Sequence, residues 1–239
     1  MIEQQGKVMK HLSIILALLI SSATASWAQG SSEEQLNNII ELQGKAKELK
    51  ILRQAWGAYK LENYDVALSL WMPLAEAGNP SAQVFIGLMY NQGNGVEQDE
   101  NEASKWYALA SEQDYAPAKW RLAMLYYHGS GLTQSYQKAA DLYHSAAKQG
   151  DVYSQKALGE MYSQGFGVPK DNIIAYSWFN IANGNGFKLA QNYQKKIAKD
   201  MTPEETFIAE ALAEKCKRSS YKNCGWLLAA ESYPAKDDN

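Results

Sequence analysis

Apolar positions recur along this chain with a period of 36 residues, and the recurrence needs no gap. An apolar run over residues 86–90 returns at 122–126 and again at 158–162. A Gly-x-Gly follows each run, and its glycines are Gly93 and Gly95, Gly129 and Gly131, and Gly165 and Gly167. Glycine makes up about 7% of residues in general, so a column of three arises by chance about three times in 10,000. Two such columns indicate genuine repeats. The repeats span residues 79–114, 115–150 and 151–186.

The pattern within each repeat predicts two helices. In the first repeat, Ala103, Trp106, Tyr107 and Ala110 are spaced i, i+3, i+4 and i+7, which places them on one helical face. The Gly-x-Gly ends the preceding helix, because a residue with positive φ commonly closes a helix at its carboxyl end. Residues suited to cap the second helix precede it in all three repeats, namely Asp99, Ser135 and Asp171. Val and Ile are sparse outside the N-terminal segment, so we expect an all-α fold.

The flanking segments read as further helices of the same array. Residues 50–78 have the spacing of a helix pair with a shorter turn, and residues 29–49 are expected to form a capping helix at the N-terminal end. Residues 187–230 are expected to form C-terminal capping helices, the last of which opens with a capping box at residues 202–205. Repeat arrays need such atypical end units to close the core. The final residues, 231–239, are expected to be disordered.

The repeat resembles the Sel-one-like repeat family, a relative of the tetratricopeptide repeat. The family pattern is roughly Ala, Leu-Gly-x-x-Tyr, Gly-x-Gly-Val, Asp and Ala-x-x-Trp-Tyr-x-x-Ala-Ala. The middle unit departs most from it, since Leu142 replaces the Trp and Ser135 replaces the Asp. The resemblance implies a right-handed α-solenoid of antiparallel helix pairs, in which residues 50–78 form a tetratricopeptide-like pair. It also implies that partners are held on the concave face, which the first helix of each unit lines.

Carrying over the tetratricopeptide pattern points to six partner-binding residues on that concave face. They are Trp120, Met124, Tyr127, His128, Tyr153 and Lys156. The repeat framework does not require Trp120, because the other units have Val84 and Lys156 in its place. An aromatic there is either end-on core packing or a binding anchor, and binding hot spots favour Trp, Tyr and Arg. The expected function is therefore a non-catalytic scaffold for another envelope protein or a peptide segment, with a cell-surface polysaccharide as the other ligand that these residues fit.

The first 28 residues read as a secretion signal. A positively charged segment precedes an apolar run over residues 12–20, and small residues allow cleavage after Ala25 or Ala28. Either Met1 or Met9 is compatible with such a signal as its start. The apolar run is too short to span a bilayer, which takes about 20 residues. We therefore expect an exported chain, periplasmic or secreted, with no membrane insertion after cleavage.

Cysteine usage fits an exported protein. The two cysteines, Cys216 and Cys224, lie eight residues apart and are expected to form a disulfide in an oxidising compartment. A zinc or redox site would need further ligands or a Cys-x-x-Cys, and the sequence has neither. The disulfide is expected to pin the C-terminal tail onto the last helix.

The sequence contains no convergent set of reactive residues. The formal net charge is −3 with no basic block, which argues against nucleic acid as a partner. The Gly-x-Gly lacks the third glycine and the preceding strand of a dinucleotide site. His128 occupies a polar position at a helix end, and His144 is expected to be exposed on a helix; neither has a metal-ligand partner at suitable spacing. No cofactor or metal is therefore expected.

The alternative function is a hydrolase that acts on β-lactams or peptidoglycan-like amides, because some cysteine-rich members of this family have been described as β-lactamases. Ser-x-x-Lys, the pattern of that chemistry, starts at Ser135, Ser145 and Ser219. The companion Ser-Asp-Asn and Lys-Thr-Gly elements are missing, as is the disulfide in every repeat that marks those relatives. The chain is therefore not expected to be an enzyme.

Overall fold

The computed structural model describes residues 34–221 and Cys224. The secretion signal expected over residues 1–28 and the tail expected over 231–239 lie outside the described residues. The chain divides into two units, one that ends at Arg53 and one that begins at Gln54.

The described part of the first unit, residues 34–53, is helical throughout. The helical state runs on through residue 60, so the boundary expected between residues 49 and 50 is not a helix end. Residues 45–55 contain neither Gly nor Pro and are rich in Ala, Lys, Leu and Glu, which all favour helix, so nothing in the sequence ends the helix there. The capping role of residues 29–49 stays a prediction.

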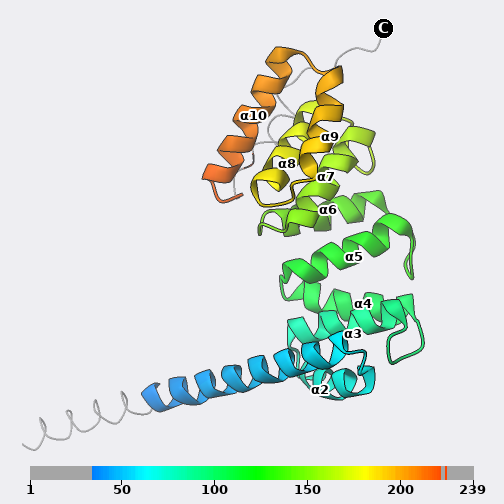
Figure 1. Ribbon diagram of the computed structural model, residues 1–239, viewed down its shortest axis with the longest axis vertical. Helices are drawn as coiled ribbons and strands as arrows, with labels where there is room; N and C mark the ends of the chain where they lie inside the picture. Colours follow the sequence, from blue (N-terminus) through cyan, green and yellow to red (C-terminus); the bar gives the residue numbers. More distant parts are fainter. Residues whose placement is uncertain (1–33, 222–223, 225–239) are drawn as a thin grey trace, which may run out of the picture. The chain divides into compact units, whose positions relative to one another are not determined.

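The second unit is a stack of antiparallel helices (Figure 1). Its helices are α2 (Tyr64–Glu76), α3 (Pro80–Gln92), α4 (Glu100–Glu112), α5 (Ala116–His128), α6 (Tyr136–Ala147), α7 (Val152–Gln164), α8 (Asn172–Gly184), α9 (Ala190–Ile197), the short 3-10 helix η1 (Ala198–Asp200) and α10 (Pro203–Arg218). Each helix from α2 to α9 packs against its neighbours in sequence, and α10 folds back to pack on α8. The described residues contain no strand. The all-α solenoid of helix pairs is thus confirmed.

Local sequence sets where these helices begin and end. The predicted caps are confirmed, because Asp99, Ser135 and Asp171 each accept a hydrogen bond from the backbone N–H three residues later. The first helix of each repeat ends at a glycine in the left-handed region, with φ of 69° at Gly93, 73° at Gly129 and 77° at Gly165. A side chain is rarely tolerated in that conformation.

The second glycine of each Gly-x-Gly has a different role, which is to let consecutive repeats stack. A Cβ at Gly131 would lie 2.4 Å from the carbonyl carbon of Glu100, at the start of α4. A Cβ at Gly167 would lie 2.3 Å from the carbonyl carbon of Tyr136, at the start of α6. In both cases the obstacle is the backbone of the preceding repeat, which cannot swing aside as a side chain can.

Two features expected near the C-terminal end are present, whereas the capping role of residues 187–230 stays a prediction. Thr202 and Glu205 form a reciprocal capping box at the start of α10, and Pro203 occupies the first turn. The Cys216–Cys224 disulfide is present and both sulfur-bearing residues are buried. The disulfide therefore ties the chain beyond α10 back to its last turn.

Candidate functional site

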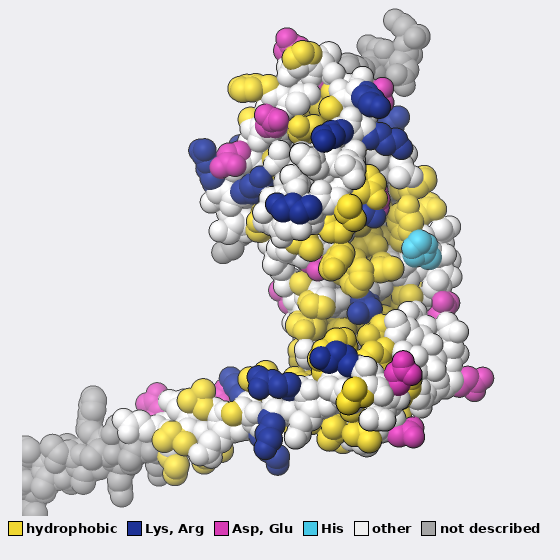
Figure 2. Space-filling view, viewed as in Figure 1, with side chains coloured by type: hydrophobic (Ala, Val, Ile, Leu, Met, Phe, Trp, Pro, Cys, Tyr) yellow, Lys and Arg dark blue, Asp and Glu magenta, His cyan; other side chains and the backbone are white. Residues whose placement is uncertain are grey.

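The six predicted concave-face residues lie on the first helices of two consecutive repeats. Trp120, Met124, Tyr127 and His128 are on α5, whereas Tyr153 and Lys156 are on α7. Tyr153 is 51% exposed, and Met124 and His128 are also exposed, while the other three are half-buried. Figure 2 shows hydrophobic side chains gathered in a hollow of the surface along the middle of the stack.

A row of three aromatic rings crosses from one first helix to the next. The ring centroids of Trp120 and Tyr153 are 5.2 Å apart, and those of Tyr153 and Phe187 are 6.1 Å apart. Phe187 precedes α9 and was missed in the sequence, because it lies one residue beyond the last repeat. Its equivalents Tyr115 and Asp151 in the earlier repeats share no single chemistry, so no column singled it out. The row offers a continuous apolar strip that the repeat framework does not require.

A second group of rings surrounds Tyr127. Its centroid lies 5.1 Å from that of Tyr136, 5.0 Å from that of His128 and 6.2 Å from that of Phe166. Tyr136 and Phe166 stack on each other at 4.9 Å. Phe166 is the middle residue of a Gly-x-Gly, and Tyr136 follows the Gly-x-Gly of the preceding repeat. The helical periodicity gives no reason to expect an aromatic residue at either position.

Cationic side chains lie beside these rings. The Arg121 guanidinium is 5.2 Å from the Trp120 ring centroid and 5.8 Å from that of Tyr107, within the range of a cation–π contact. The Lys156 ammonium donates to Glu160 Oε2 at 2.6 Å and lies 5.6 Å from the Tyr193 ring centroid. Cationic side chains therefore accompany the apolar rings in this part of the stack.

The Ser-x-x-Lys serines are engaged in structural contacts. Ser135 caps α6, and Ser219 Oγ donates to the carbonyl of Cys216 at 2.8 Å. Ser145 Oγ accepts a hydrogen bond from Lys119 Nζ at 2.5 Å, and Lys119 is not the lysine of its Ser-x-x-Lys motif, which is Lys148. The same Nζ is ion-paired with the carboxylate of Asp114, so Lys119 joins Ser145 on α6 to the loop before α5.

Lys119 belongs to a column of buried polar residues that sequence reasoning missed. It stands in the place of Gln83 and Gln155, 36 residues to either side, and all three are buried. The side-chain amides of Gln83 and Gln155 donate to the carbonyls of Ala75 and Ala147, at 3.1 and 3.2 Å, in the helix before them. The column thus ties each repeat to the preceding one. No periodicity could reveal it, because polar residues at these positions resemble surface residues in the sequence.

The expectation that His144 is exposed was wrong. The side chain is half-buried between α6 and the neighbouring repeat, with Nε2 3.1 Å from the Tyr162 hydroxyl and the ring 5.8 Å from that of Trp178. Burial lowers the pKa of His144 to about 4. Its equivalents Ala108 and Asn180 gave no sign of an aromatic environment, since the contacts come from Tyr162 on α7 and Trp178 on α8.

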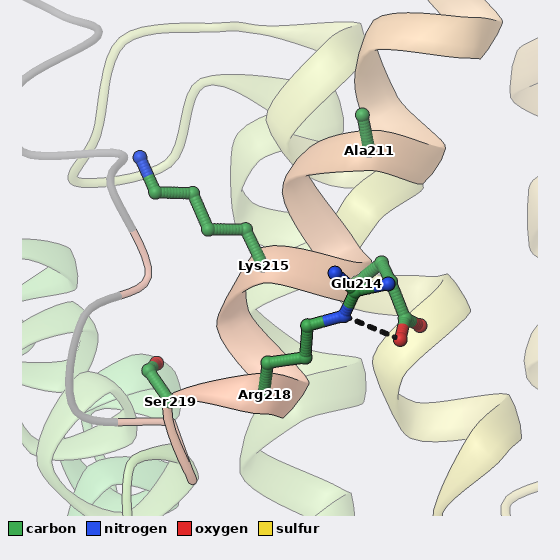
Figure 3. Close-up of a pocket in the computed structure, with 5 residues that line it drawn as sticks. All are labelled: Ala211, Glu214, Lys215, Arg218 and Ser219. Carbon is green, nitrogen blue, oxygen red and sulfur yellow. Dashed lines mark hydrogen bonds and ion pairs between the residues drawn. The ribbon is translucent and has the colours of Figure 1, made fainter.

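One further feature of the described residues is a surface depression away from the aromatic rings. A shallow depression on α10 is lined by Ala211, Glu214, Lys215, Arg218 and Ser219. Figure 3 shows Lys215 pointing away from the Glu214–Arg218 pair, whose atoms Oε1 and Nε are 3.3 Å apart. Over residues 34–221 and Cys224, no three His, Cys, Asp or Glu side chains are grouped as metal ligands. No helix in this part of the chain has the length and apolarity to cross a membrane.

Comparison with known proteins identifies the repeat. The Sel1 repeat model matches three consecutive segments, at residues 80–115, 116–151 and 152–187. No curated protein matches the chain.

Solved structures of the same architecture are also similar. A Sel1 repeat protein from Oxalobacter formigenes is 29% identical with a TM-score of 0.57, over 60% of this chain and 59% of that one. A protective antigen of uropathogenic Escherichia coli with an SLR fold is 21% identical with a TM-score of 0.47, over 78% of this chain and 49% of the antigen. The chain spans less than two thirds of the length of either protein.

Proposed function

Because this chain is a Sel1-repeat protein over residues 80–187, we propose that it is a non-catalytic scaffold whose concave surface binds a protein or peptide segment. The observation that carries the proposal is the row formed by Trp120, Tyr153 and Phe187. The framework rings Trp71, Tyr107, Trp178 and Phe179 are almost fully buried, as a helical stack requires. The row is partly exposed instead, and exposed aromatic side chains beside an Arg are typical of binding hot spots.

The chemistry of the surface suits an extended segment with apolar side chains and a carboxylate. The rings offer apolar contact along the stack, and Arg121 lies over one of them with its guanidinium at 5.2 Å. Met124 is 36% exposed on the same helix and adds an adaptable apolar contact. Tyr127, His128 and Lys156 extend the proposed surface with polar groups.

The proposal places the scaffold in the periplasm or outside the cell. The Cys216–Cys224 disulfide supports an oxidising compartment, where such bonds persist. The partner would then be another envelope protein. The non-catalytic part of the proposal is supported by the contacts of Ser145, whose hydroxyl accepts from Lys119, a side chain that is also ion-paired with the carboxylate of Asp114.

The proposal is tested by site-specific photo-crosslinking from position Tyr153 in the native host. We expect one envelope protein to be captured there, and a Trp120→Ala change to abolish the adduct. The matched control is Phe207→Ala, which removes an aromatic side chain that is 73% exposed on α10 and should leave the adduct unchanged. An adduct that survives Trp120→Ala in a folded protein would show that the surface assignment is wrong.

Two further measurements separate the other functions. Binding of the purified chain to a glycan array, lost in the Trp120→Ala, Tyr153→Ala variant, would replace the protein partner with a polysaccharide. Covalent labelling by a fluorescent penicillin, lost in Ser145→Ala, would establish the hydrolase and overturn the scaffold. We expect neither result.

A further inference from the structure

The helix over residues 34–53 carries an exposed apolar stripe that its own unit does not cover. Ile39, Leu42, Ala46 and Leu49 are spaced three, four and three residues apart, which is the a and d spacing of a coiled coil. The exposed fractions are 51% for Ile39, 65% for Leu42 and 62% for Leu49. Leu36 and Ile40 widen the stripe in the N-terminal half. A contiguous apolar surface of this kind marks an interaction site.

Charge is distributed unequally between the two halves of this helix. Residues 34–43 contain two carboxylates, Glu34 and Glu41, and no basic side chain. Residues 44–53 contain four basic side chains and one carboxylate, namely Lys45, Lys47, Lys50, Arg53 and Glu48. Two such helices side by side in parallel would place the basic halves together. Two in antiparallel would place each acidic half beside a basic half.

The apolar stripe is also symmetric about Gly44. Ile39 and Leu49 lie five residues to either side of it, and Leu42 and Ala46 lie two residues to either side. An antiparallel partner of the same sequence would therefore set Ile39 opposite Leu49 and Leu42 opposite Ala46. Both pairings match an a position with a d position, which fills the seam between residues 39 and 49 with apolar side chains.

We propose that this helix pairs with the same helix of a second copy of the chain, in antiparallel orientation about Gly44. The pairing is separate from the concave surface and does not depend on the partner bound there. The two copies of Lys45 would meet near the midpoint. Each donates to its own Glu41 at 2.5 Å, so this repulsion is partly compensated within each helix. The charge pattern and the symmetric stripe select the second copy as the occupant.

The first test is the mass of the full chain in solution, produced with its own leader and purified as the cell processes it. Light scattering over a concentration series should show a concentration-dependent dimer. Leu42→Lys should weaken the dimer by about tenfold or more, because it removes a buried leucine from the seam. Asn37→Lys adds the same charge on the opposite face and should leave the dimer intact. A chain that is monomeric at all concentrations, or a dimer unaffected by Leu42→Lys, would overturn the proposal.

The second test measures orientation. Gly44 and Asn37 are one heptad apart, so both lie on the helix face opposite the stripe and nitroxide labels at Gly44→Cys or Asn37→Cys have the same sideways separation. Antiparallel pairing about Gly44 leaves the two Gly44→Cys labels level with each other. The two Asn37→Cys labels are offset by about 21 Å along the helix axis, since a helix rises 1.5 Å per residue and the displacement counts once for each copy, so their distance should be clearly longer. Equal distances at both positions would mean parallel pairing and would contradict the antiparallel arrangement.

Discussion

At the scale of single residues, the two glycines of each Gly-x-Gly should differ in their tolerance of substitution. Gly129 has a positive φ, and a Cβ there would lie 3.1 Å from Gln134 Cβ, a tight contact that a shift of a few tenths of an ångström relieves. Gly131 has a positive φ and also faces the Glu100 backbone at 2.4 Å. We expect Gly129→Ala to cost about 1 kcal/mol of unfolding free energy and Gly131→Ala about 3 kcal/mol. Chemical denaturation of both variants measures the difference, and equal losses would contradict the stacking role of the second glycine.

His144 should make the stability of the stack depend on pH. Its pKa in the folded chain is about 4, below the ordinary value of 6.5, because burial disfavours the charged ring. The folded state therefore resists protonation, so stability is fully present above about pH 6.5 and is lost as the pH falls towards 4. A difference of this size corresponds to at most about 3 kcal/mol.

The measurement is the difference in unfolding free energy between the natural chain and His144→Asn, taken at several pH values. Asn180 stands in the same place in the next repeat, which makes asparagine a suitable replacement. The natural chain should lose stability relative to the variant between pH 6.5 and 4.5. A constant difference over that range would show that His144 is as free to protonate in the folded chain as in the unfolded one.

At the scale of helices, the helical periodicity and the helix caps could be predicted because they depend on residues that are close together in the sequence. Asp99, Ser135 and Thr202 each bond to the backbone three residues away, so the sequence around them contains the whole interaction. Contacts between repeats could not be predicted in this way. Trp120 was identified as an aromatic outside the framework, whereas Phe187 became recognisable only when the stack brought it to Tyr153. The burial of Lys119 could not be predicted either, because a lysine in a helical sequence is ordinarily expected at the surface and its partners become known only from the structure.

The pair formed by Lys119 and Asp114 fastens α5 to the loop before it, and the two should be energetically coupled. Lys119 is buried and Asp114 is exposed, so Asp114→Ala would leave an ammonium in the core with fewer partners. Lys119→Gln supplies the residue that both neighbouring repeats have in this place and should be tolerated within about 1 kcal/mol. We expect Asp114→Ala to lower the unfolding free energy by about 1 kcal/mol more in the natural chain than in the Lys119→Gln variant. The difference is no larger because solvent screens the exposed carboxylate.

A double-mutant cycle on unfolding free energies checks this coupling. Gln149 also donates to Asp114, at 3.1 Å, and this contact is present in both backgrounds and therefore cancels. If the effects of the two substitutions on the unfolding free energy prove additive, the ion pair does not stabilise the attachment of α5 to the loop before it.

At the scale of the whole molecule, a solenoid responds to damage locally, because each repeat contacts only its neighbours. The Cys216–Cys224 disulfide closes a loop at one end of the second unit, on the helix that packs against α8. A closed loop of this length contributes about 2.5 kcal/mol in the chain-entropy account. Removing it should therefore loosen the C-terminal end before it affects the middle of the stack.

We expect Cys216→Ser, Cys224→Ser to speed backbone hydrogen exchange in α9 and α10 while exchange in α3 to α5 stays at its natural rate. Reduction of the natural chain should reproduce this pattern, and the same reductant should have no effect on the double variant. Equal acceleration in all helices would mean that the array unfolds as one cooperative unit. The rings of the proposed binding surface lie on α5, on α7 and just before α9, so under local loosening we expect Phe187 to be disturbed first and Trp120 to be left in place. Binding that depends on Trp120 should then survive loss of the disulfide, although contacts made by Phe187 should weaken.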